Sequence, residues 1–158
     1  PWVEEFENQF CRRMGHDFGI AMNSATSGLH ASLLACGVGS GDEVISPGLT
    51  VVMDAYATLF CNATPIFADV EKDSWNIDPE SVRRKITPKT KAVLAVSWLG
   101  LPSNLGELRK ICDEFGLYLI DDSAETMPES DCLPPDWNAP DIRVFSFESK
   151  KHMPTGYN

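Results

Sequence analysis

Short apolar runs alternate with helix-like segments along most of this 158-residue chain. Runs rich in Val, Ile and Leu occur at residues 42–46, 65–70, 91–97, 117–122 and 142–147. Such nearly continuous apolar runs are typical of parallel strands that are buried on both faces. Parallel neighbours need a long crossover connection, which is usually a helix. The pattern therefore predicts an α/β fold, with a mostly parallel sheet covered by helices on both faces.

The segments between these runs carry helix signals. The expected helices are 25–36, 50–61, one that begins at Pro79, and 105–116. Asp78 is placed to cap the third of these helices, and Gly116 is placed to end the last one. The Pro- and Asp-rich segment 127–141 is expected to be a long loop before the final strand.

Composition narrows the class of protein. With 43% hydrophobic and 23% charged residues, the chain resembles an ordinary globular domain. The formal net charge of −10 argues against binding to nucleic acid or to an anionic membrane. No apolar run approaches the roughly 20 residues that span a bilayer, and the first residues lack the layout of a signal peptide. We therefore expect a cytoplasmic protein.

Cysteine and histidine usage gives little support for disulfides or metal. The five cysteines are scattered without a CxxC pair, which is typical of thiols in a reducing compartment. None of the three histidines stands beside a second plausible ligand, so no metal site is expected.

The first chemical signal is the segment NSATSGLH, where small residues lead into the helix at 25–36. The N–H groups of Ala25, Thr26 and Ser27 are candidates to hold a phosphate, because the first N–H groups of a helix lack partners within it. The alternative is plain helix capping, which Ser and Thr perform in most proteins.

The second signal is the strand end LIDDSAE, which brings Asp121, Asp122 and Glu125 to the edge of the sheet. A carboxylate there can bind a cation, a ribose or a protonated ring nitrogen. A solvated strand end is the alternative for each residue taken singly.

The third signal is FSFESKK, in which Ser146 lies at a strand end and Lys150 and Lys151 follow it. A lysine here is a nucleophile if its pKa is lowered, or else a solubilising surface residue. Because the carboxyl ends of parallel strands meet at one edge, all three signals are expected close together. An anion cradle, a carboxylate and an amine are the set that pyridoxal 5′-phosphate requires.

At this point the chain resembles the DegT/DnrJ/EryC1/StrS family of fold-type I aminotransferases over nearly its whole length. The matching segments, in the family's order, include NSATSGLH, GSGDEVISP, PIFADVEKDSWNIDPE, ITPKTKAVLAVSWLGLP, FGLYLIDDSAE and FSFESKKHMPTG. The resemblance implies that residues 1–158 form the pyridoxal-phosphate-binding large domain, without the family's C-terminal small domain. It also implies a homodimer when the protein is full length.

The resemblance also implies roles for particular residues. Members present Phe-Ser-Phe, then three residues, then the lysine that binds the cofactor covalently, and this spacing falls on Lys151. Asp122 corresponds to the partner of the ring nitrogen, and Glu125 to a residue near the cofactor's O3′ or the reacting sugar. The released Lys151 amine would move protons during the reaction. The remaining cofactor-binding residues are expected to hold the phosphate, as the helix start and the resemblance together imply. They are Ala25, Thr26, Ser27 and Ser146.

One position departs from the family. Val51 stands where members commonly carry an aromatic ring that stacks on the cofactor. Val51 is still expected to contact the cofactor, through a thinner apolar surface.

The function that these features predict is transamination. The resemblance implies that an amino acid, glutamate in our hypothesis, donates its amino group to a nucleotide-linked keto-deoxysugar. One alternative is a sugar 3-dehydratase of the same family, although such enzymes carry His where this chain has Lys151. The other is a non-catalytic fragment that binds the cofactor or a sugar nucleotide. Neither nucleic acid nor a membrane is an expected partner.

Overall fold

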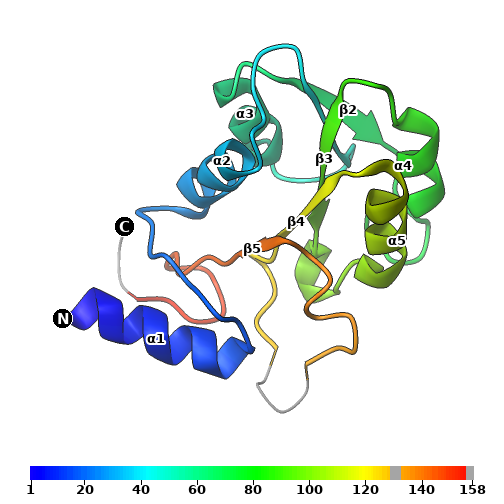
Figure 1. Ribbon diagram of the computed structural model, residues 1–158. Coiled ribbons are helices and arrows are strands. Elements are labelled where there is room, and N and C mark those ends of the chain that lie inside the picture. The colour runs from blue at the N-terminus through cyan, green and yellow to red at the C-terminus, as the bar shows by residue number, and fades with distance from the viewer. Residues whose placement is uncertain (129–132, 156–158) are drawn as a thin grey trace.

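The computed structural model describes residues 1–128 and 133–155 of the chain. Its centre is a five-stranded sheet in the order β2-β1-β3-β4-β5, and all neighbouring strands are parallel (Figure 1). The strands are β1 (Glu43–Pro47), β2 (Thr64–Ala68), β3 (Thr90–Val96), β4 (Tyr118–Asp122) and β5 (Ile142–Val144). The predicted parallel sheet is confirmed.

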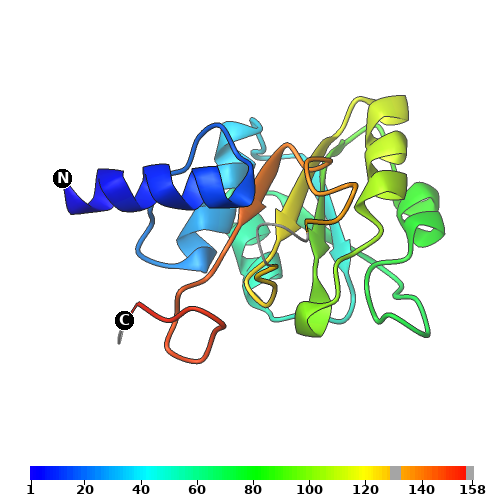
Figure 2. The ribbon, with the colours of Figure 1, turned by 90° about the horizontal axis from the view of Figure 1, so that it is seen from below.

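Helices cover both faces of this sheet, as the sequence predicts (Figure 1, Figure 2). The helices on one face are α2 (Ala25–Ala35) and α3 (Met53–Phe60), and those on the other are α4 (Pro79–Lys85) and α5 (Leu105–Phe115). Successive strand residues point to opposite faces. Val44 and Leu94 therefore belong to the core under α2 and α3, whereas Ile45 and Val93 belong to the core under α4 and α5.

The helix boundaries follow their capping residues. The Ser24 hydroxyl accepts a 3.1 Å hydrogen bond from the Ser27 N–H and so caps α2. Asp78 caps α4 in the same way, and Gly116 ends α5 with a φ of 67°. Both of these predictions are confirmed. Capping satisfies N–H groups that have no partner within the helix.

Two predicted strands end earlier than expected. The strand predicted at 65–70 ends at Ala68, because the next N–H, that of Asp69, donates to the Ser81 hydroxyl in α4. The strand predicted at 142–147 ends at Val144. Beyond it, Phe145 and Phe147 contact a helix instead of extending the sheet. The predicted helix 50–61 begins later than expected, at Met53.

That contacting helix, α1 (Trp2–Met14), was not predicted from the sequence. The Phe6 and Phe10 rings meet Phe145 and Phe147 edge to face, with centroids 5.0–5.2 Å apart. The helix therefore holds in place the segment that follows the last strand.

The long loop before β5 is present as predicted, although residues 129–132 lie outside the described part. The buried Trp137 donates from Nε1 to the Met14 carbonyl at 2.7 Å, so this loop is fastened to α1. The guanidinium of Arg143 lies 3.4 Å from the centre of the Trp137 ring. Its Nε is 3.2 Å from Asp121 Oδ2, which completes a fully buried ion pair.

The four described cysteines, Cys11, Cys36, Cys61 and Cys112, are buried and unpaired, as predicted. Burial raises the pKa of Cys36 to about 11 and that of Cys112 to about 12, so these thiols stay protonated and unreactive. Cys132 lies outside the described residues. Across residues 1–128 and 133–155, no helix has both the length and the apolar character to cross a bilayer.

Candidate active site

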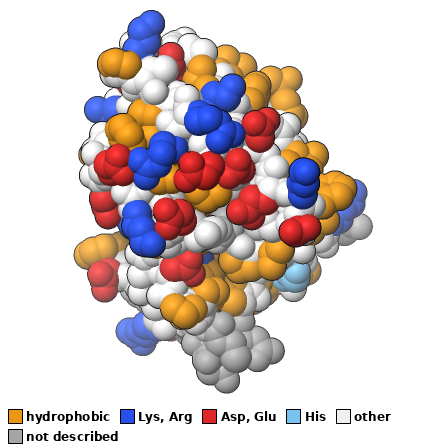
Figure 3. Space-filling model, turned by 90° about the vertical axis from the view of Figure 1, so that its right-hand side faces the viewer, with side chains coloured by type: hydrophobic (Ala, Val, Ile, Leu, Met, Phe, Trp, Pro, Cys, Tyr) orange, Lys and Arg blue, Asp and Glu red, His pale blue; other side chains and the backbone are white. Residues whose placement is uncertain are grey.

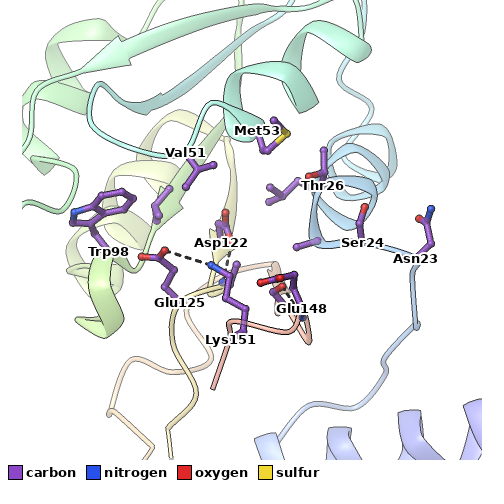
Figure 4. A pocket seen from close by; sticks show the side chains of 15 residues that line it. Asn23, Ser24, Thr26, Val51, Met53, Trp98, Asp122, Glu125, Glu148 and Lys151 are labelled. Atoms are coloured by element: carbon purple, nitrogen blue, oxygen red, sulfur yellow. Dashed lines mark hydrogen bonds and ion pairs between the residues drawn. The ribbon is translucent and has the colours of Figure 1, made fainter. Parts of the chain in front are cut away.

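A cavity of about 290 Å³ opens at the carboxyl edge of the sheet, beside the start of α2 (Figure 4). This is the place where open parallel sheets bind ligands. Of the residues predicted from the sequence, those that line it are Ala25, Thr26, Val51, Asp122, Glu125, Ser146 and Lys151. Four separate segments of the chain therefore converge on one cavity.

The start of α2 forms one wall. Ala25 and Thr26 occupy its first turn, where N–H groups have no partner within the helix. Ser27 differs from the expectation, because it does not line the cavity and its N–H is already taken by the Ser24 hydroxyl. Gly28 lets this helix lie close to the sheet, since a Cβ there would stand 3.0 Å from Val144 Cγ1.

The segment after β5 supplies the lysine. Lys151 lines the cavity, whereas Lys150 is exposed to solvent outside it. The Lys151 N–H donates a hydrogen bond to the Glu148 carbonyl at 2.9 Å and closes a turn that contains both lysines. Ser146 is buried on the same segment and also faces the cavity. The structure thus distinguishes two lysines that are adjacent in the sequence.

Glu125 ties this lysine to the opposite wall. Its Oε1 lies 3.4 Å from Lys151 Nζ, and its Oε2 accepts a 3.1 Å hydrogen bond from the Leu99 N–H. Figure 4 shows Glu125 and Lys151 pointing toward one another across the cavity. The carboxylate therefore holds both the amine and the loop after β3.

Asp122 forms the floor of the cavity at the end of β4. Its side chain is 8% exposed, and its Oδ1 accepts a 2.9 Å hydrogen bond from the Ala124 N–H. Burial raises the pKa of Asp122 well above its usual range, and the neighbouring Asp54 carboxyl raises it further. A cation placed against such a carboxyl offsets the cost of burying its negative charge.

Other lining residues were missed by sequence reasoning. They are Asn23, Ser24, Leu29, Met53, Val96, Trp98, Ala124 and Glu148. Trp98 begins the short 3₁₀ turn η1 (Trp98–Gly100), and its N–H donates to Asn76 Oδ1 at 3.0 Å. Its position directly after a strand end was a usable signal. Trp98 gives the cavity an aromatic surface that Val51 does not provide.

Comparison with known proteins agrees with this architecture. The model of the DegT/DnrJ/EryC1/StrS aminotransferase family matches residues 1–157. The chain belongs to this family.

Three solved structures illustrate the similarity. DesV of S. venezuelae, in complex with a ketimine intermediate, is 29% identical, with a TM-score of 0.90 over 99% of this chain and 42% of its own. NtdA from Bacillus subtilis, with bound cofactor PMP, is 29% identical, with a TM-score of 0.93 over 99% of this chain and 35% of its own. DesI, in the presence of its TDP-sugar product, is 37% identical, with a TM-score of 0.83 over 96% of this chain and 38% of its own. The chain thus spans less than half the length of each.

Proposed function

We propose that this chain is the cofactor-binding large domain of a pyridoxal-phosphate-dependent sugar aminotransferase. The observation that carries the proposal is the convergence of three chemical groups on one cavity. They are the first turn of α2, the buried Asp122 carboxyl and the Lys151 amine. Family membership supports the same reaction class.

The residues present fit the three polar groups of pyridoxal phosphate, which are its phosphate, its ring nitrogen and its aldehyde. The N–H groups of Ala25 and Thr26, with the Ser146 hydroxyl, suit the phosphate. Asp122 suits the ring nitrogen, because a cation there offsets the cost of burying its charge. Lys151 suits the aldehyde. The volume of about 290 Å³ lies near the lower end of ligand sites, which is roughly 300 Å³.

When bound, the cofactor supplies an aldehyde that takes up amines and a ring that accepts electrons. The chain's own residues supply position and proton transfer. The Lys151 Nζ is placed to take and return a proton, while Glu125, 3.4 Å away, holds that amine in the cavity. Asp122 keeps a negative charge against the ring, and Val51 and Trp98 keep water from the apolar side.

The substrates belong to the same proposal. We infer an amino-acid donor, glutamate in our hypothesis, and a nucleotide-linked keto-deoxysugar as the acceptor. The similarity to DesI, whose structure was determined in the presence of its TDP-sugar product, supports the acceptor class. A cytoplasmic location also belongs to the proposal, supported by the four described cysteines, which are unpaired.

A homodimer is the remaining part of the proposal. The side of the molecule covered by α2 and α3 exposes an apolar patch, which consists of Leu34, Tyr56, Leu59 and Phe60. The Tyr56 and Phe60 rings stack with centroids 6.2 Å apart, and both remain more than two-fifths exposed. Exposed apolar patches of this kind mark interaction surfaces. We propose that a second copy covers it.

The decisive experiment uses the two adjacent lysines of the full-length protein. After loading with pyridoxal phosphate and borohydride reduction, peptide mass mapping should place the pyridoxyl group on Lys151. Lys151→Ala should abolish this labelling, and the matched control Lys150→Ala should keep it. Labelling of Lys150, or of neither lysine, would contradict the proposal.

A further inference from the structure

Asn76 is a buried amide that the proposed mechanism does not use. It lies between β2 and α4, is 2% exposed and does not line the cavity. Its Nδ2 donates to the Leu101 carbonyl at 3.0 Å and to the Pro102 carbonyl at 3.1 Å. Its Oδ1 accepts from the Trp98 N–H at 3.0 Å. Both N–H donors of the amide are therefore used, and they join Asn76 to both ends of the turn that follows β3.

The backbone of Asn76 is itself held in place. Its N–H donates to the Ser74 hydroxyl at 3.2 Å, and its carbonyl accepts from the Glu71 N–H at 2.9 Å. The next residue, Ile77, is fully buried in the core under α4 and α5. A side chain whose own position is fixed by packing and hydrogen bonds is a rigid support for its neighbours. Asn76 is such a support for the turn at Trp98.

The supported turn has an unfavourable backbone conformation. Leu99 has a φ of 51°, in the left-handed region that residues other than glycine rarely adopt. Such a conformation persists only where the surroundings enforce it. Leu99 is 77% exposed, so the packing of its side chain contributes little. The hydrogen bonds around it supply the constraint, namely those of Asn76 and the 3.1 Å bond from the Leu99 N–H to Glu125 Oε2.

Trp98 depends on this turn for its place in the cavity wall. The residue lines the cavity and packs against the core under α2 and α3. Figure 4 shows Trp98 and Thr26 on opposite sides of Asp122. Because the Trp98 N–H is bound to Asn76, a displaced turn would carry the ring with it. An aromatic contact depends on the distance and angle of the ring, so such a displacement would weaken it.

We propose that Asn76 is a positioning residue for the active site, which holds the turn after β3 so that the Trp98 ring stays in the cavity wall against the bound cofactor. Asn76 acts through Trp98 and has no contact with the cofactor itself. This inference rests on the proposed function, because the contact that it protects is one with pyridoxal phosphate.

The first measurement needs neither a variant nor a cofactor. Hydrogen exchange in the unmutated full-length protein should be slowed about 100-fold or more at the Trp98 N–H, relative to an unstructured peptide. The reason is that its hydrogen bond to Asn76 must open before exchange occurs. Exchange at the rate of an unstructured peptide would overturn the inference.

The second test is calorimetric titration of the full-length protein with pyridoxamine 5′-phosphate, which needs no bond to Lys151. Asn76→Ala should weaken binding about fivefold. The matched control is Asn104→Ala at the other end of the same loop, where Asn104 Oδ1 caps α5 by accepting from the Glu107 N–H at 3.2 Å. The control should bind within about twofold of wild type. Unchanged binding by Asn76→Ala, or equal weakening in both variants, would overturn the inference. Failure of the unmutated protein to bind would instead overturn the proposed function.

A double-mutant cycle separates positioning from a general loss of stability. Trp98→Leu keeps an apolar contact with the core and removes the ring, so by itself it should weaken binding about fivefold. If Asn76 acts through Trp98, adding Asn76→Ala to Trp98→Leu should cost about twofold or less. A further fivefold loss in the double variant would overturn the inference. Wild-type binding by Trp98→Leu alone would also overturn it, and this arm does not depend on the folding of Asn76→Ala.

Discussion

Asp121 and Asp122 are neighbours in β4, yet they face opposite sides of the sheet and have different surroundings. Asp121 is fully buried on the side of α4 and α5, where Arg143, Ser97 and Ser123 surround its carboxylate. Asp122 opens into the cavity on the side of α2, and no Lys or Arg among residues 1–128 and 133–155 forms an ion pair with it. On one face a buried carboxylate is paired within the chain, whereas on the other a buried carboxyl faces a cavity.

The outer surfaces of the two faces repeat this contrast. Lys and Arg side chains are interspersed with Asp and Glu over the face covered by α4 and α5 (Figure 3). Arg83 joins α4 to α5 through Glu114 at 2.8 Å and lies over the Phe115 ring. The α2 and α3 side instead exposes the apolar patch of Leu34, Tyr56, Leu59 and Phe60. The charged face suits contact with water, and the apolar patch suits contact with another protein surface.

The largest expected effect concerns the face covered by α4 and α5, where Asp121 pairs with Arg143. Asp121→Asn leaves the buried Arg143 without its ion partner and should lower the free energy of unfolding by about 3–5 kcal/mol. Urea unfolding measures the change. Asp113→Asn removes an exposed partner of Arg109 and should change stability by about 0.5 kcal/mol or less. Similar effects for both variants would break the contrast between a buried pair and a surface pair.

Asp122→Asn tests the side of the sheet where Asp122 lines the cavity. A neutral amide does not stabilise a cationic ring, so the rate of transamination in the full-length protein should fall about 10²- to 10³-fold. The fold should persist, because removing a carboxyl with a raised pKa relieves a buried charge. Steady-state kinetics and circular dichroism measure the two effects. Near-wild-type activity would remove Asp122 from its proposed role.

The apolar patch gives the next prediction. Phe60 is 58% exposed on α3, and Phe115 is 44% exposed beside Arg83 on the opposite side. Phe60→Glu should weaken self-association of the full-length protein by about 2 kcal/mol or more, because a charge then enters the proposed interface. Light scattering across a concentration series measures this effect. Phe115→Glu should leave association unchanged, and an equal loss in both variants would contradict the assignment of the interface to one face.

The smallest expected effect concerns the cavity wall. Val51→Phe adds an aromatic surface where the chain has a small apolar one, and it should tighten cofactor binding by about 0.5–1.5 kcal/mol. Val52→Phe is the matched control, because Val52 is similarly exposed but does not line the cavity. Fluorescence titration measures the affinities. Unchanged or weaker binding by Val51→Phe would indicate that Trp98 already supplies the aromatic contact.

Much of the site was predictable because it lies at the ends of elements with strong local signals. Apolar runs located the strands, and the strand ends then located Asp122, Glu125 and Ser146. The spacing from Phe145 that the family resemblance implies singled out Lys151 over Lys150, and the structure places only Lys151 in the cavity. Their chemical roles remain predictions.

Other features depend on partners that are distant in the chain. The packing role of the phenylalanines of α1 is not visible in the sequence, because their partners, Phe145 and Phe147, are far away in the chain. The N–H of Ser27 was a candidate phosphate donor until its hydrogen bond to Ser24 was known. Asn76, which holds the loop at Trp98, carries no local signal for that contact.

The sequence alone therefore determined the alternation of strands and helices, the edge of the sheet where chemistry gathers, and the lysine to be tested. The first two follow from local periodicity and capping, which act over a few residues, and the lysine follows from the spacing that the family resemblance implies. Only the tertiary structure decided that β5 stops at Val144 and that the buried Asp121 pairs with Arg143. The physical reason is that burial and electrostatic coupling depend on distances through space, and residues far apart in the chain set those distances.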